Sequence, residues 1–208
     1  MENKYNKILD IEFKEVDIGL EKTEFIQEYS KLSFNGFFFV KSIESENTEL
    51  KSYLNSIHKP LEDFDINISF QSASIDAKDF IFNLIKNKSL KKLSLSFYDE
   101  DDYLTIDSKY DSFENFRKLY ISELNKIKLQ KRLYQIANEG SIYDKWNISD
   151  RLTSKMIDDF IGNLFDNNNY RIFELSDWNG FDMGWYVSFL FINLEKSQIT
   201  FFAKDDYD

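Results

Sequence analysis

The sequence predicts an α+β fold, with a largely antiparallel or mixed sheet, about five helices and a three-stranded meander at the C-terminal end. Three observations support this. Stretches that alternate apolar and polar residues, as half-buried strands do, recur between stretches with apolar residues at helical spacing. Serines and other polar residues occupy the second face of several strand-like stretches, so we expect one sheet face to be wet or only partly covered. Apolar residues make up 42% of the 208 residues, with 21 Phe and 12 Tyr, enough for a core.

The first half of the chain predicts strands and helices in alternation. Leu9, Ile11 and Phe13 alternate with charged residues, which is the period of two of a first strand. Aromatic residues at helical spacing predict a helix over 21–31. A strand is expected at 37–40, after the turn Asn35-Gly36. A helix capped by Asn47 or Thr48 follows, with Leu50, Leu54 and Ile57 inward. The next expected elements are a strand at 66–70, a helix capped by Ser74 and a strand at 93–97.

The second half predicts two helices followed by the meander. We expect the longest helix to open at a capping box of Asp111 and Glu114, to run to about Asn138 and to stop at Gly140. Its buried stripe is predicted to consist of Phe113, Phe116, Tyr120, Leu124 and Ile127. A helix capped by Ser149 follows, with Leu152, Met156, Phe160 and Leu164 inward, and then strands at 170–176, 185–193 and 198–203. The middle strand is apolar almost throughout, so we expect it to be central and covered on both faces.

No internal repeat and no linker rich in proline, glycine or serine divides the chain. We therefore expect one α+β domain over 1–208, with 1–108 and 109–208 as possible subdomains that share an interface.

The residue types that most enzymes use are scarce. The chain contains no Cys and a single His, His58, so zinc sites, Ser-His-Asp triads and Cys-His pairs cannot be assembled in their usual forms. The six glycines are scattered and form no phosphate-binding loop. We expect no cofactor and no catalysis. Asp10, Glu12 and Lys14 could hold a divalent metal, but an outward strand face carries such residues by default.

The formal net charge of −11 points to the kind of partner. A field of this sign attracts basic proteins and repels nucleic acid and anionic membranes, so we expect a basic protein partner, no direct nucleic acid and no membrane. The absence of Cys, the polar N-terminus and the lack of a long apolar stretch predict a soluble, cytoplasmic protein. One window, 111–138, carries +3, which we expect to pair with the protein's own acids or with a second copy.

Three segments combine acids with large aromatic residues. Acids supply steering and discrimination, and aromatic side chains supply rigid contact area. The competing interpretations are a solvated turn, aromatic rings folded back onto the sheet, and a frayed tail. The residues predicted to bind a partner are Tyr98, Asp99, Glu100, Asp101, Asp102, Tyr103, Asp107, Tyr110, Asp177, Trp178, Phe181, Asp182, Asp205, Asp206 and Tyr207.

In charge, lack of Cys, the acid-tyrosine segment 98–110 and the aromatic C-terminal meander, the chain resembles bacterial immunity proteins, the antitoxins of polymorphic or contact-dependent toxin systems. The resemblance is one of type, without a shared motif. It implies stoichiometric inhibition of a toxin by covering its active site. Two alternatives stay open: a phage-encoded nucleic-acid mimic that inhibits a host defence protein, and an uncharacterised metal-dependent hydrolase.

Overall fold

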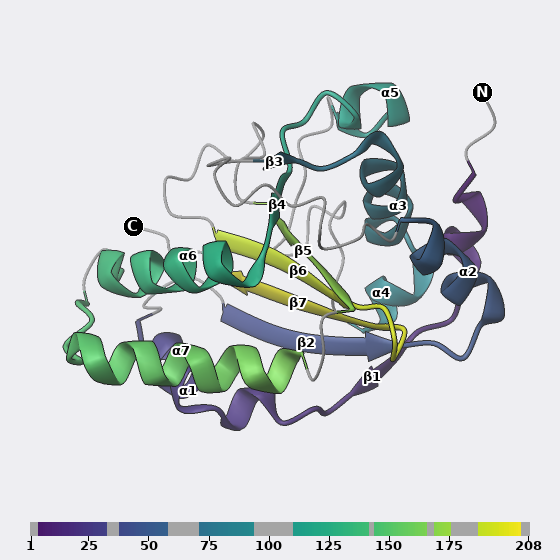
Figure 1. Cartoon of the computed structure of the whole chain (residues 1–208). Coiled ribbons are helices and arrows are strands. Elements are labelled where there is room, and N and C mark those ends of the chain that lie inside the picture. Colours follow the sequence, from purple (N-terminus) through teal and green to yellow (C-terminus); the bar gives the residue numbers. More distant parts are fainter. Residues whose placement is uncertain are drawn as a thin grey trace.

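The chain folds around a seven-stranded antiparallel sheet with helices on both faces (Figure 1). The structure is a computed structural model, and it describes residues 4–32, 38–57, 71–93, 110–141, 144–165, 169–175 and 187–204. The strands lie in the order β1-β2-β7-β6-β5-β4-β3. Their bounds are β1 Lys14–Val16, β2 Phe38–Glu44, β3 Gln71–Ser72, β4 Ser122–Leu124, β5 Tyr170–Glu174, β6 Val187–Asn193 and β7 Gln198–Lys204. The α+β prediction is therefore confirmed.

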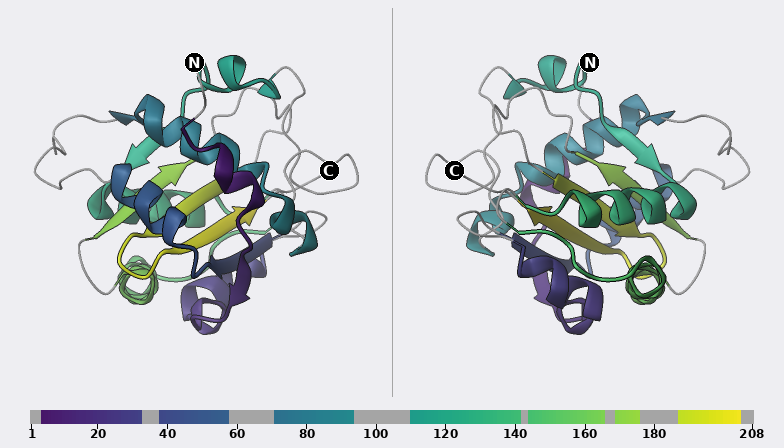
Figure 2. Two further views of the ribbon diagram at one scale, coloured as in Figure 1. Left: turned by 90° about the vertical axis from the view of Figure 1, so that its right-hand side faces the viewer. Right: turned by 90° about the vertical axis from the view of Figure 1, so that its left-hand side faces the viewer.

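Within the described residues the chain forms seven α-helices, where the sequence predicted about five, and two short 3-10 helices. These are η1 Asn6–Asp10, η2 Leu20–Lys22, α1 Glu24–Ser30, α2 Thr48–Ser56, α3 Ile75–Ile85, α4 Lys88–Lys92, α5 Phe113–Phe116, α6 Lys126–Glu139 and α7 Asp150–Leu164. The helices α1, α6 and α7 cover one face of the sheet, and η1 and α2 to α5 cover the other (Figure 2). Strands from 1–108 and from 109–208 share this one sheet.

The predicted meander is β5-β6-β7, and its middle strand is central, as expected. Every residue of these three strands is buried. Alternate residues point to opposite faces, so Leu190 packs in the first core cluster with α2 and α3, whereas Phe189 packs in the second with α1, α6 and α7. Helices cover both sides of the middle strand, as expected, and they cover both sides of its two neighbours as well.

The predicted first strand is shifted. Residues Asn6–Asp10 form η1, and pairing begins only at Lys14. The side-chain amide of Asn87 donates to the carbonyls of Ile8 and Ile11, which ties this stretch to α4 instead of to the sheet. The predicted strand at 66–70 lies outside the described residues, as does that at 93–97 except for Leu93, which follows α4.

The predicted long helix is instead three elements. It forms α5, then β4 between β3 and β5, then α6, which is capped by Asn125. The carbonyls of Arg117 and Leu119 accept hydrogen bonds from Lys78 Nζ and not from a following helical turn. Two residues of the predicted buried stripe are consequently exposed, Tyr120 at 40% and Ile127 at 51%. The cap of α5 is Ser112, one residue after the predicted Asp111.

Several predicted helix ends are confirmed. The Asn47 side chain accepts from Glu49 N at the start of α2, and the Ser74 side chain accepts from Ala77 N at the start of α3. Gly140 ends α6 with φ of +71°. The side chains of Asn47 and Ser74 satisfy backbone groups that a helix end leaves unpaired, and Gly140 adopts a positive φ that other residues rarely adopt, which is why local sequence identifies these ends.

Replacing Gly140 with alanine is expected to lower the free energy of unfolding by at least about 1–2 kcal/mol, because a side chain at positive φ is strained. A Cβ there would also lie 2.5 Å from the Asp144 carbonyl oxygen. The matched control is Gly162→Ala in α7, where a Cβ meets nothing within 4 Å and helix propensity predicts a gain of about 1 kcal/mol. Urea denaturation of both variants tests this, and equal effects would contradict it.

Candidate functional site

Most of the predicted partner-binding residues lie outside the described ranges. Tyr110 is the only one of them that the structure describes. It is half-buried and packs against the first core cluster, so only part of its ring is available to a partner. The contact role of this residue and of the others stays a prediction.

The formal charge of the chain is unevenly divided. The described residues contain 22 acidic and 24 basic residues, a net charge of +2. The remaining residues contain 15 acidic and two basic residues, a net charge of −13. The acid excess of the chain therefore belongs entirely to the residues outside the described scaffold, and three segments that contain the predicted contacts, 94–109, 176–186 and 205–208, hold ten of those 15 acids. We call these three the acidic segments.

Two of the acidic segments are attached to the scaffold at neighbouring positions. Segment 176–186 joins Leu175 to Val187, and segment 205–208 follows Lys204. Val187 is the register partner of Lys204, and Leu175 donates its N–H to the carbonyl of Ser188. The sheet thus brings both attachment points to one end of its central strands.

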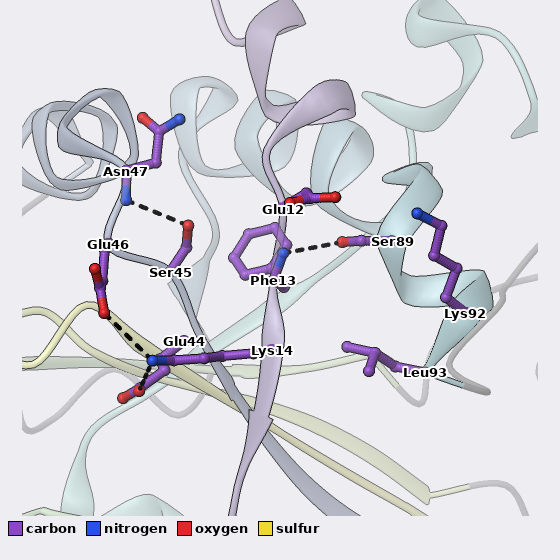
Figure 3. A pocket seen from close by; sticks show the side chains of 10 residues that line it. All are labelled: Glu12, Phe13, Lys14, Glu44, Ser45, Glu46, Asn47, Ser89, Lys92 and Leu93. Carbon is purple, nitrogen blue, oxygen red and sulfur yellow. Dashed lines mark hydrogen bonds and ion pairs between the residues drawn. The ribbon is translucent and has the colours of Figure 1, made fainter.

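A hollow of about 470 Å³ lies beside β1, and we call it the first hollow (Figure 3). Its residues come from three stretches that are distant in sequence: the start of β1, the turn between β2 and α2, and α4. They are Glu12, Phe13, Lys14, Glu44, Ser45, Glu46, Asn47, Ser89, Lys92 and Leu93.

Charged side chains dominate the first hollow. Lys14 Nζ lies 3.2 Å from an oxygen of Glu44 and 3.3 Å from an oxygen of Glu46. Hydrogen bonds to these two carboxylates raise the pKa of Lys14 above its ordinary value. Phe13 donates its backbone N–H to Ser89 Oγ at 3.2 Å, which fastens the start of β1 to α4. The hollow therefore has a fixed frame and a polar, mixed-charge lining.

The three residues considered for a metal, Asp10, Glu12 and Lys14, do not meet at one point, although Glu12 and Lys14 both line the first hollow. Asp10 pairs with Lys88 at 2.6 Å, Lys14 pairs with the β2–α2 turn, and Glu12 lines the hollow. Across the described ranges there is no group of three or more His, Asp or Glu side chains placed to hold a metal ion. In the described part of the chain, these three residues therefore do not form a shared metal site.

Buried charges are a feature that the sequence analysis missed. Arg171 on β5 and Glu123 on β4 form an ion pair at 2% and 1% side-chain exposure. Arg132 of α6 pairs with Glu174 on the other face of the sheet, with Nε 2.7 Å from the carboxylate. Arg171 lies inside an apolar run, so periodicity alone gives no sign that it is paired.

Two arginines of the basic window 111–138 form ion pairs with acids of the same chain. Arg117 forms a two-armed ion pair with Asp79, and Arg132 pairs with Glu174 and Glu139. The expectation that this window pairs with the protein's own acids is confirmed for its two arginines. Because the predicted helix is broken, the window does not form one continuous strip.

Together, the fold and the first hollow define an α+β protein whose antiparallel sheet is covered on both faces and carries a polar hollow at one edge. No protein-family model matches the chain, and neither a curated protein nor a solved structure matches it. None of the helices in the described ranges has both the length and the apolar character needed to cross a membrane.

Proposed function

We propose that the chain is a cytoplasmic binding protein of the immunity type, which neutralises a basic toxin domain by covering its active site and catalyses no reaction of its own. The observation that carries the proposal is the division of charge. The described residues carry a net charge of +2, whereas the three acidic segments contain ten acids and one base, a net charge of −9, and also hold most of the aromatic residues predicted to contact a partner.

This division suits an inhibitor for a physical reason. Charges gathered in a few segments produce a directional field, which speeds encounter with a basic surface more than the same charges spread evenly. Close charge pairs at interfaces have coupling energies of roughly 1.5–7 kcal/mol, enough to support tight binding. A central meander buried on both faces stiffens the described scaffold to which these segments are attached.

The proposal predicts a toxin reading frame beside the gene for this chain, and the toxin domain that this reading frame encodes is the partner used in the test. Mixing the two proteins should give a salt-sensitive complex close to one-to-one, and toxin activity should fall in proportion to the amount of chain added. The control is a basic protein of similar size without toxin activity. A neighbouring toxin that shows neither binding nor loss of activity would overturn the proposal.

A further inference from the structure

Among the described strands, β1 forms one edge of the sheet and pairs only with β2 (Figure 1). In a strand, residues two apart direct their backbone groups to the same side. Phe13, the residue before β1, donates its N–H to Ser89 of α4. Strand alternation continued from Phe13 directs the N–H and C=O of Glu15 away from β2 as well. Beyond the β1–β2 ladder, no backbone hydrogen bond joins Glu15 to another described residue. Among the described residues, the edge is therefore closed by α4 at Phe13 and has no further backbone partner at Glu15.

A second hollow, of about 220 Å³, continues along β1 from the first. The first hollow includes Phe13 of the first core cluster, and the second includes Leu20 and Val40 of the second cluster. The two hollows thus border the strand towards opposite sheet faces. An added strand would direct alternate side chains to these two faces.

Acids outnumber bases in the two hollows. Their acids are Glu12, Glu44, Glu46, Glu15, Asp17 and Glu21, and their bases are Lys14, Lys92 and Lys41. Lys14 is held by Glu44 and Glu46, and Lys41 lies 3.8 Å from Glu15 and donates to the carbonyl of Leu93. Lys22, which does not line either hollow, pairs with Asp17 at 3.3 Å. The edge therefore has an excess of two acids over bases, and a basic segment is its complement.

We propose that the β1 edge binds an extended basic segment of a partner protein, which adds to the sheet as a further strand. Backbone hydrogen bonds to Glu15 supply the pairing, and lysine or arginine side chains meet the acids of the two hollows. This inference rests on the proposed function in taking the partner to be basic. A second copy of the chain is a poorer occupant, because antiparallel pairing centred on Glu15 would place two glutamates opposite each other.

The test uses a peptide of eight residues that alternates valine and lysine as the probe, with calorimetry for affinity and NMR for position. We expect saturable binding that perturbs the amides of residues 12–17. Glu15→Pro should weaken binding at least tenfold relative to Glu15→Ala. Both variants lose the same charge, but only proline loses the outward N–H, and proline is tolerated at strand edges.

Further measurements distinguish strand addition at β1 from misfolding of the variant and from self-association of the chain. A thermal melt establishes that Glu15→Pro is folded; where it is not, a probe N-methylated at alternate residues should fail to bind the unmutated chain. No saturable binding, equal binding by the two variants, or undiminished binding of the N-methylated probe overturns the inference. So does self-association of the free chain that Glu15→Pro abolishes, which assigns the edge to a second copy. The peptide experiment requires no toxin. A negative result with the peptide therefore does not decide the toxin experiment, and a negative result with the toxin does not decide the peptide experiment.

Discussion

Replacing Glu123 with alanine is expected to lower the free energy of unfolding by about 3–5 kcal/mol, because the change leaves a buried positive charge without its counter-charge. Glu123 and Arg171 are 1% and 2% exposed, and Nη2 of Arg171 has no hydrogen-bond partner of its own. Without the carboxylate, the guanidinium must remain uncompensated or draw water into the sheet. Urea denaturation monitored by tryptophan fluorescence measures the loss.

The matched control for Glu123→Ala removes both charges, as Glu123→Leu with Arg171→Met. Paired removal replaces an ion pair by apolar groups of similar volume, which in other buried pairs is neutral or stabilising. The double variant should therefore be markedly more stable than Glu123→Ala. A loss below about 1 kcal/mol for Glu123→Ala would contradict this expectation. It would mean that water reaches the ion pair in solution, so that the pair contributes as little as one at the protein surface.

Reversing the four acids Asp99–Asp102 to lysine is expected to slow association with a basic toxin domain by about 10-fold to 1000-fold at low salt. The change moves the formal net charge from −11 to −3, since each reversal adds two charges. Steering acts on encounter, so the dissociation rate should change less than the association rate. Stopped-flow kinetics at two salt concentrations measures both. An unchanged association rate would exclude this segment from the steering surface.

Local signals predicted much of the fold. The caps Asn47 and Ser74 and the stop at Gly140 depend on backbone groups within a few residues, so the sequence contains all that is needed to find them. The strands of the meander are rich in apolar residues, and their existence and order were predicted correctly.

Tertiary contacts account for what the sequence did not reveal. The long helix predicted over 111–138 is interrupted for two reasons. Lys78 donates hydrogen bonds to the carbonyls of Arg117 and Leu119, and β4 pairs with β3 and β5 in the sheet. The first hollow was missed for a similar reason. Glu12, Glu44 and Lys92 are far apart in sequence, and only the pairing of β1 with β2 beside α4 brings them around one space.

The measurement that tests the central claim most directly compares two variants of equal charge. One carries the lysine reversal at Asp99–Asp102. The other carries the same reversal at four exposed scaffold acids that form no ion pair with any described residue, Glu24, Asp144, Asp159 and Glu195. Both have a formal net charge of −3. If the acidic segments direct recognition, the association rate constant for the basic toxin domain at low salt falls at least tenfold further in the first variant. Equal rate constants would contradict the account, because total charge alone would then explain the binding.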